Sequence, residues 1–445
     1  MPADIVYRWL MRPGATARLT PPWTSLVVAQ PGVPARGGSR IAGRIGRGPG
    51  RGPWVLERGV VLEGRIIEDR QVTGPFSFWT HRQSIEPTGP DGCRLTDRIE
   101  YALPAGLLGS LGTQWLPTRL ARAFHYRHQT ISQDLADHLR HAGQPRLRVA
   151  VTGAGGLIGR NLTAFLSAAG HDVRPVVRTT PGDRQIGWNP AAGTIDRALL
   201  EGVDAVIHLA GENIAAHRWT PSRREAIRAS RSSATRLLAE TLAGLERPPR
   251  LFLSASAVGL YGDRGEELMT ESSPAGTGFL AEVCRAWEAA TAPAAAAGVR
   301  VLTLRFGVVL TPAGGALARM LPAFRAGLAG RLGSGRQWLS WIGIDDVLGA
   351  INHLLFATDP AGPVNMVAGA VRNAEFTRSL ASVLHRPAVL PVPAPLLRLA
   401  VGGLADEGLL ASTRVDPGFL RETGYRYRHG DLATALPHLL GRERS

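Results

Sequence analysis

This 445-residue chain contains no lysine, so apart from histidine its basic side chains are all arginines. The formal net charge is +15, but the arginines are spread along the chain and no nucleic-acid-binding motif accompanies them. Enrichment in arginine, alanine and glycine without lysine is typical of a GC-rich genome. We therefore expect no nucleic-acid partner.

Cysteine and long apolar runs are also scarce. The two cysteines, Cys93 and Cys284, lie far apart, which excludes a disulfide framework and a cysteine-spaced metal site. No apolar run reaches the roughly 20 residues that span a bilayer. The first residues include an early acid and lack the apolar core of a signal peptide. These absences predict a cytoplasmic protein without membrane insertion.

The stretch Leu147–Gly159 has the pattern of an apolar strand, a glycine turn and the start of a helix. Its glycines, Gly153, Gly156 and Gly159, follow a G-x-x-G-x-x-G spacing. Such a turn lets the backbone approach a pyrophosphate, and the helix N-terminus favours the negative charge of that group. The segment therefore predicts a dinucleotide-binding turn.

From residue 147 onward, apolar strand candidates alternate with helices. Repeated strand–helix units predict a parallel, doubly wound sheet of the α/β Rossmann type. The strand candidates are Leu147–Thr152, Asp172–Val177, Ala205–Leu209, Arg250–Ser254 and Val299–Phe306, and the clearest helices are Arg223–Leu245 and Leu280–Ala297.

Residues 1–142 follow a different pattern, in which several strands come first and one long helix closes the segment. Apolar residues from Leu116 to Leu139 mark one face of this helix, so we expect an α+β unit. The strand candidates are Trp54–Leu62, Arg65–Val72, Phe78–Ile85 and Leu95–Leu103.

Four histidines, His125, His128, His138 and His141, lie on this predicted helix. His125 and His128 share a face by their spacing. Zinc needs more ligands than this pair, and no cysteine or carboxylate cluster supplies them. We therefore expect a solvated helix face and no metal site.

With Thr152 ahead of it, the glycine turn resembles that of the short-chain dehydrogenase/reductase superfamily, in its extended, epimerase-like branch. An atypical subfamily of this branch, which carries a small C-terminal domain of unknown function, is resembled by further segments. These are Val206–Ile214, Arg228–Arg231, Ser254–Gly262, Phe279–Glu288, Leu304–Gly307, Trp338–Asp346 and Phe376–Leu440. One departure is Gly343, where the family more often has histidine.

The resemblance implies a Rossmann domain over residues 147–372 and a small C-terminal domain over residues 373–445. It also implies a set of cofactor-binding residues around the glycine turn and the end of the third predicted strand. These are Gly153, Gly156, Leu157, Ile158, Gly159, Leu209, Ala210 and Gly211, together with Arg178.

Arg178 decides the expected cofactor. It follows the second predicted strand about 20 residues beyond the glycine turn, where an acid would hold the ribose of NAD. An arginine at that place can pair with a 2′-phosphate instead. We therefore expect NADP as the cofactor.

The chemistry is harder to assign, because typical members of the superfamily use a Tyr-x-x-x-Lys pair. This chain has Leu280 and Cys284 at those positions. The resemblance places Ser256 where a hydroxyl bonds the reacting oxygen. Tyr261 and Glu282 are the other catalytic candidates, and an apolar pocket around Glu282 would suit it to proton transfer.

Two further residues are expected to hold a polar group of the substrate. Glu212 lies just beyond the third strand, at the edge where α/β ligands bind. Arg231 follows on the next helix, and both belong to segments that carry the family resemblance.

The front segment resembles the helix-grip, START-like (SRPBCC) superfamily, whose sheet wraps a long helix around an apolar cavity. The segments that carry this resemblance are Arg12–Gly14, Leu19–Trp23, Gly74–Phe76 with Trp79 and His81, and Asp97–Tyr101. It implies a START-like domain over residues 1–142 that holds a hydrophobic ligand.

These patterns predict an NADP(H)-binding, epimerase-like oxidoreductase that acts on a small-molecule substrate without the usual Tyr-Lys pair. The alternative is a non-catalytic NADP(H)-binding sensor or scaffold with a START-like ligand-binding module. A third reading makes the front domain the active part, as a cyclase-like or lipid-binding module. The sequence leaves the substrate and the oligomeric state open.

Overall fold

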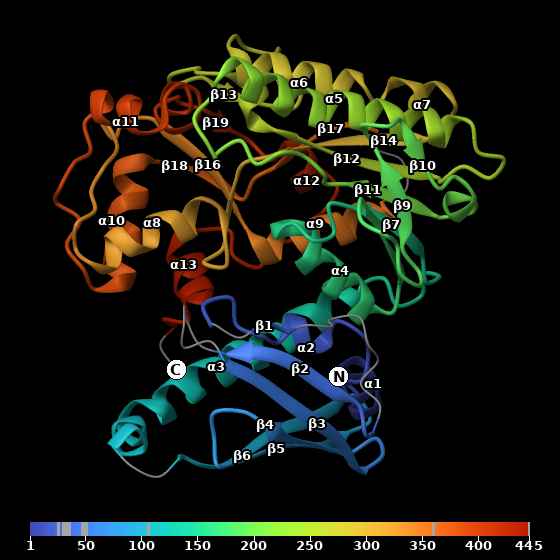
Figure 1. Cartoon of the computed structure of the whole chain (residues 1–445), viewed down its shortest axis with the longest axis vertical. Helices are drawn as coiled ribbons and strands as arrows, with labels where there is room; N and C mark the ends of the chain where they lie inside the picture. Colours follow the sequence, from blue (N-terminus) through green and yellow to red (C-terminus); the bar gives the residue numbers. More distant parts are fainter. Residues whose placement is uncertain (25–26, 29–36, 46–51, 105–106, 358–360, 444–445) are drawn as a thin grey trace. The chain divides into compact units, whose positions relative to one another are not determined.

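The computed structural model describes residues 1–445 except 25–26, 29–36, 46–51, 105–106, 358–360 and 444–445 (Figure 1). The chain divides into two compact units. Unit 1 comprises Met1–Gly143, Thr163–His171 and Glu443–Ser445, and unit 2 comprises Gln144–Leu162 and Asp172–Arg442. Among the helices of these described residues, none is both long and apolar enough to cross a membrane.

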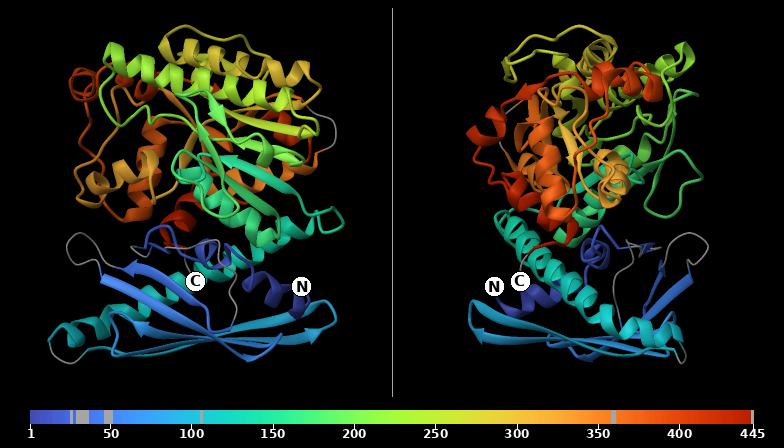
Figure 2. Two further views of the ribbon diagram at one scale, coloured as in Figure 1. Left: turned by 45° about the vertical axis from the view of Figure 1, so that its right-hand side comes forward. Right: turned by 90° about the vertical axis from the view of Figure 1, so that its left-hand side faces the viewer.

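Unit 1 pairs a six-stranded antiparallel sheet with the long helix α3 (Leu107–Leu139), which crosses one face of the sheet (Figure 2). The strands lie in sequence order. They are β1 (Val27–Val28), β2 (Arg40–Ile45), β3 (Gly52–Leu62), β4 (Ile66–Thr73), β5 (Phe78–Gly89) and β6 (Gly92–Ala102), and two short helices, α1 (Ala3–Leu10) and α2 (Ala15–Arg18), precede them.

The α+β pattern predicted for this part of the chain is present, and helix α3 begins earlier than the apolar stripe from Leu116 suggested. Alternation along β5 explains the packing, because every second side chain from Trp79 to Ile85 is buried. One part of the core is apolar and joins Trp9, Ile67 and Leu135. Trp9 also bonds His138, which is buried, so the expectation of a solvated face was wrong for that histidine.

Unit 2 is built on an eight-stranded sheet in the order β10-β9-β8-β7-β11-β12-β14-β17. All neighbours are parallel except the edge pair β9 and β10. The strands are β7 (Arg148–Thr152), β8 (Asp172–Val177), β9 (Ile186–Asn189), β10 (Thr194–Ile195), β11 (Ala205–His208), β12 (Leu251–Ala257), β14 (Arg300–Phe306) and β17 (Gly362–Met366).

Helices cover both faces of this sheet, so the predicted doubly wound α/β fold is confirmed. In Figure 1, α5 (Pro221–Ala243), α6 (Phe279–Ala289) and α7 (Ala292–Ala296) lie over one face. Helices α4 (Leu157–Ala169) and α9 (Ile344–Phe356) lie over the other. The single helix predicted over Leu280–Ala297 is two helices, because Pro293 has no N–H to continue the ladder across the break.

The rest of unit 2 adds two small sheets and several short helices. Residues of α8, α10 and α13, among them Leu321, Phe376 and Leu436, share one apolar core with β16. The elements are β13 (Leu268–Met269), β15 (Val308–Leu310), β16 (Trp338–Gly343), β18 (Gly369–Arg372), β19 (Arg414–Val415), α8 (Gly315–Arg325), α10 (Asn373–Leu384), α11 (Ala394–Val401), α12 (Gly418–Glu422), α13 (Leu432–Leu440), and the turns η2 (Ala198–Leu200), η3 (Val258–Tyr261) and η4 (Ala405–Leu409).

Candidate functional site

The topology of the large sheet identifies one edge as a ligand crevice. Strand β7 lies between β8 and β11. The chain first adds β8 on one side of β7 and later adds β11 on the other side, so the strand order reverses at β7. Thr152 at the end of β7 stands beside Val176 of β8 and His208 of β11. In open α/β sheets, ligands bind outside the carboxyl ends of the strands at such a switch point.

The glycine turn lies at this switch point. Gly153 has a φ of +67°, and a Cβ there would lie 2.7 Å from the carbonyl carbon of Leu209. A Cβ on Gly159 would lie 2.1 Å from the carbonyl oxygen of Gly153. Both glycines are therefore required by the protein's own packing. A side chain at Gly153 would therefore disturb the fold of the turn itself, before any contact with a bound pyrophosphate.

Gly155 is the glycine that faces open space. Nothing lies within 4 Å of the Cβ that a side chain would place there, and the residue is exposed. Its neighbour Gly156 closes the turn by donating to the carbonyl of Gly153 at 2.8 Å. The spacing rule treated Gly155 as a variable position and missed it, although the adjacent Gly155-Gly156 pair was a signal.

Thr152 fixes the end of β11 beside the turn. Its hydroxyl oxygen accepts from the backbone N–H groups of Leu209 and Ala210 at 3.1 and 3.2 Å. The hydroxyl group donates a hydrogen bond of 2.7 Å to Nδ1 of His208. Burial, aided by the charge of Arg231, lowers the pKa of His208 to about 3, so the ring is neutral. His208 is therefore a structural residue that holds Leu209 and Ala210 against Gly153.

Arg178 lies where the sequence predicted it, one residue beyond the end of β8. The side chain is exposed, and within the part of the chain that the structure describes it makes no hydrogen bond or ion pair. Its guanidinium is therefore available to a ligand at the switch point.

The two predicted substrate-binding residues are engaged with the protein itself. Arg231 donates to the carbonyls of Glu212 and Ile227 at 3.0 and 3.2 Å. The Glu212 carboxylate accepts from Arg223 at 3.0 Å. Gly211 leaves room for this arrangement, since its missing Cβ would lie 3.4 Å from the Arg231 guanidinium. These contacts support the loop after β11, and a substrate role for either residue stays a prediction.

Ser256 belongs to a buried polar network at the ends of β12 and β14. Its hydroxyl donates to Glu288 at 2.6 Å, and Arg305 holds the same carboxylate with two hydrogen bonds of 2.9 Å. Burial alone would lower the pKa of Arg305, but the contacts to Glu288 raise it above its ordinary value. Sequence reasoning missed Glu288 and Arg305, although both stand in segments that carry the family resemblance.

Tyr261 completes this network. Its side chain is fully buried, and its hydroxyl bonds Asn365 at 2.7 Å and Arg305 at 2.9 Å. Burial raises the pKa of Tyr261. These contacts describe a core residue, so the catalytic role predicted for Tyr261 stays a prediction that its burial weakens.

The positions of the usual Tyr-Lys pair are apolar in this chain. Cys284 is buried on α6, and burial raises the pKa of its thiol to about 11. Leu280, one turn earlier, packs near Gly259 of η3. Neither side chain supplies an acid or a fixed positive charge.

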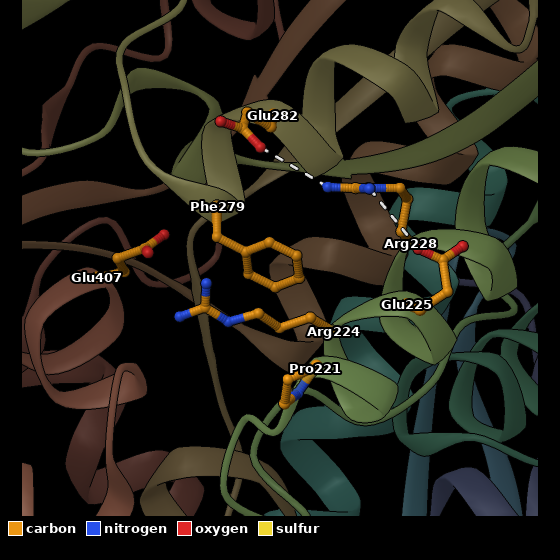
Figure 3. A pocket seen from close by; sticks show the side chains of 7 residues that line it. All are labelled: Pro221, Arg224, Glu225, Arg228, Phe279, Glu282 and Glu407. Atoms are coloured by element: carbon orange, nitrogen blue, oxygen red, sulfur yellow. Dashed lines mark ion pairs between the residues drawn. The ribbon is translucent and has the colours of Figure 1, made fainter.

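Glu282 lies elsewhere, in a pocket at the N-terminal ends of α5 and α6 (Figure 3). Figure 3 shows Glu282 and Arg228 pointing toward one another, and the carboxylate and guanidinium are 3.7 Å apart. Arg224 lies over the ring of Phe279 at 5.1 Å. The expectation of an apolar pocket around Glu282 was therefore wrong, because its surroundings are charged and exposed. The full lining is Pro221, Arg224, Glu225, Arg228, Phe279, Glu282 and Glu407.

The described residues contain no group of three or more His, Cys, Asp or Glu side chains that is arranged to hold a metal ion. The site built above rests instead on backbone at the glycine turn, one free arginine and a buried polar network.

Sequence comparison gives this arrangement a family. Residues 149–368 match the NAD dependent epimerase/dehydratase family, and residues 392–439 match a domain of unknown function, DUF1731. An epimerase family protein of Mycobacterium bovis is 43% identical over 290 residues, which are 65% of this chain and 96% of that protein. The chain belongs to the NAD-dependent epimerase/dehydratase family. The predicted resemblance to epimerase-like proteins with a C-terminal domain of unknown function is confirmed.

Two solved structures extend the comparison. The crystal structure of a nucleoside-diphosphate sugar epimerase from Corynebacterium glutamicum is 34% identical with a TM-score of 0.82, over all of this chain and 89% of that one. The human epimerase family protein SDR39U1, solved with NADPH, is 34% identical with a TM-score of 0.61, over 66% of this chain and 99% of that one.

Proposed function

We propose that this protein is an NADP(H)-binding, epimerase-like oxidoreductase that acts on a small-molecule substrate. The observation that carries the proposal is the crevice at the switch point, where the open face of Gly155 and the free Arg178 lie at the ends of neighbouring strands. A backbone without side chains suits a pyrophosphate, and a free guanidinium suits a 2′-phosphate. The NADPH in the human relative agrees with this assignment.

The bound nicotinamide would supply hydride transfer, and the chain would supply the remaining groups. The glycine turn and the N-terminus of α4 would hold the pyrophosphate, and Arg178 would hold the 2′-phosphate. Ser256 donates its proton to Glu288, which leaves the lone pairs of its oxygen to accept from a substrate hydroxyl. The Ser256 proton would then pass to the Glu288 carboxylate, which Arg305 holds in place.

The remaining parts of the proposal rest on the sequence. A START-like assignment of unit 1 agrees with its antiparallel sheet and long helix, and a hydrophobic ligand for that unit follows from the assignment. The two free cysteines fit a cytoplasmic setting.

Calorimetry with NADPH and NADH tests the cofactor proposal. We expect the wild type to bind NADPH at least about tenfold more tightly, since a charge-assisted contact contributes roughly 1.5–3 kcal/mol. Arg178→Ala should lose most of that difference and leave NADH affinity unchanged. Arg184→Ala, an exposed arginine that already pairs with Asp172, is the matched control.

Equal affinity of the wild type for the two nucleotides would contradict the preference, and no binding of either would contradict the proposal. Ser256→Ala should lower turnover of a carbonyl or sugar-nucleotide substrate with little loss of NADPH affinity. Tight binding of NADP and NADPH with distinct affinities and no turnover on any substrate of that panel would favour the sensor alternative.

A further inference from the structure

Unit 1 contains a row of buried polar side chains on the face of its sheet that elsewhere carries the apolar core. On the inner face of the sheet, Asp69 of β4 stands beside His81 of β5, and Gln83 of β5 stands beside Asp97 of β6. All four side chains are buried or nearly so. Burying ionisable groups beneath a helix is costly unless they are paired, so their retention calls for a reason beyond packing.

Asp97 is the centre of this row. Its Oδ1 accepts from Nε2 of His81 at 2.6 Å and from the Gln83 amide at 3.0 Å, and its Oδ2 accepts from Nε2 of His128 on α3. Only 4% of the Asp97 side chain is exposed. Burial alone would raise the pKa of Asp97, but the hydrogen bonds from His128 and His81 and the nearby charge of Arg127 hold it well below its usual range.

The two histidines that share Asp97 differ in access. The His81 side chain is 6% exposed, whereas that of His128 is 46% exposed. Both use Nε2 for the carboxylate, which leaves Nδ1 of the exposed ring as a base. A buried carboxylate that orients an accessible imidazole is the arrangement by which proteins prepare a histidine for proton transfer. The solvated face expected for this helix holds at His128, which is exposed and also bonds Asp97.

Two arginines, Arg58 and Arg127, lie near these rings. Arg58 of β3 holds Asp69 of β4 with two hydrogen bonds of 2.7 and 2.8 Å. Arg127 of α3 lies over the ring of Phe124 at 5.1 Å, and Phe124 packs edge-on against His81 at 5.0 Å. The charge of the buried Arg127 also faces Asp97 and Asp69, so Asp97 serves this guanidinium as well as the two histidines.

Aromatic side chains continue the same face beyond His81. Trp79 lies two residues earlier on β5 and packs on Phe76, Trp54 and Tyr101, with ring centroids 4.8 to 6.2 Å apart. Trp79 is buried, and among the described residues neither its indole N–H nor that of Trp54 has a hydrogen-bond partner. Buried indole donors normally find an acceptor, so these two point to an oxygen-bearing ligand.

We propose that His128, Asp97 and His81 form an acid–base site in unit 1 for a planar, weakly acidic ligand of the phenol class. The aromatic side chains contact its ring, and an indole N–H donates to its oxygen. The ligand O–H bond breaks as the proton moves to Nδ1 of His128, and the electron pair stays on the phenolate oxygen. Asp97 acts as the positioning residue, because it touches the imidazole and not the ligand.

Titration of the full-length protein with 4-nitrophenol tests this site, because the phenolate absorbs in the visible range and the phenol does not. At one pH unit below the pKa of the free probe, about a tenth of it is ionised. We expect the wild type to raise the ionised fraction at least about threefold at saturation, since a base beside the bound probe shifts its ionisation. NADPH is left out, so the result is independent of the proposed function of unit 2.

Three variants separate a proton-transfer site from a structural ion pair. His128→Gln keeps an N–H for Asp97 but cannot take a proton, so it should bind the probe within about threefold and lose the phenolate band. Asp97→Asn should reduce the band in the same way. His125→Gln, on the same helix but paired with Glu443, should keep it.

Several outcomes would overturn the proposal. These are a wild type without the phenolate band, a His128→Gln variant that keeps it, and a His125→Gln variant that loses it equally. Loss of the band on chelation with EDTA would indicate a metal site instead. If His128→Gln does not fold, ¹⁵N spectra of the wild-type histidines decide, because only a ligand at this site moves the Nδ1 resonance of His128 when 4-nitrophenol is added.

Discussion

Two neighbouring parts of the carboxyl edge of the large sheet in unit 2, called the first edge and the second edge below, are built in opposite ways. At the ends of β7, β8 and β11, the chain presents glycine backbone and Arg178, which makes no hydrogen bond or ion pair with the described residues. At the ends of β12 and β14, Ser256, Glu288 and Arg305 satisfy one another in a buried network. An edge that leaves its groups free is prepared for a ligand, whereas an edge whose groups are all paired resists change.

The comparison also separates the assignments that follow from the two edges. The first edge supports nucleotide binding through the backbone. The second contains Ser256, which the family resemblance predicts to lie beside the reacting oxygen, within a network of Glu288 and Arg305. The two edges can therefore be tested separately, by affinity at the first and by stability and turnover at the second.

Breaking the buried ion pair should give the largest effect. Arg305→Ala leaves Glu288 as a largely buried carboxylate without its ion-pair partner, so we expect the free energy of unfolding to fall by about 3–5 kcal/mol. Urea unfolding measures it. Arg421→Ala, which removes a pair with Asp416 from an exposed arginine, should leave the free energy of unfolding nearly unchanged. The double variant Arg305→Ala/Glu288→Ala should recover part of the loss, and equal losses at Arg305 and Arg421 would refute the distinction between the edges.

Adding a side chain at two glycines should separate the effect on folding from the effect on nucleotide binding at the first edge. Gly159→Ala places a Cβ against the carbonyl of Gly153, so we expect a loss of about 1–3 kcal/mol in unfolding free energy. Gly155→Val enters open space, so it should leave the unfolding midpoint unchanged while NADPH affinity falls at least about tenfold. Calorimetry and urea unfolding on both variants give the result. A stable Gly155→Val protein with full affinity would show that the phosphates do not approach this turn.

A third buried network makes stability depend on pH. Burial raises the pKa of Asp346 to about 6 from 3.8, although Tyr425 and the N–H groups of Arg428 and His429 donate to it. Between pH 3.8 and about 6, Asp346 keeps its proton in the folded chain and has lost it in the unfolded chain. The free energy of unfolding therefore falls as the pH rises across this range. We expect the wild type to lose about 1 kcal/mol relative to Asp346→Asn between pH 5 and pH 7. The same difference in unfolding free energy between the two proteins at pH 5 and at pH 7 would contradict this.

The smallest effect is expected at Cys284. Burial raises the pKa of its thiol to about 11, so it should stay protonated and unreactive at pH 8. Brief treatment of the native protein with iodoacetamide should label Cys93, which is partly exposed, and leave Cys284 unmodified. Mass spectrometry of the digested protein reads this out. Fast labelling of Cys284, with loss of turnover, would instead make it a reactive group.

Local patterns in the sequence were enough for the main strands and helices and for the family resemblance. Period-two and period-3.6 apolar spacing predicted β8 at its observed bounds and β7 within one residue, because burial of one face dictates both patterns. The glycine spacing and Arg178 could be placed at the crevice for the same reason, since the carboxyl ends of consecutive parallel strands meet at one edge.

Only the tertiary structure decided what each polar side chain does. Glu288 and Arg305 stand 17 positions apart and Asp97 and His128 stand 31 apart, so no local rule pairs them. It also decided which glycine is open, because whether a Cβ meets backbone or empty space depends on how Leu209 of one strand approaches Gly153 of another. The sequence by itself determined strands, helices and family, since these follow from burial patterns along the chain. Partners, access and charge states followed only from the fold, because they depend on which distant residues the packing brings within a few ångströms.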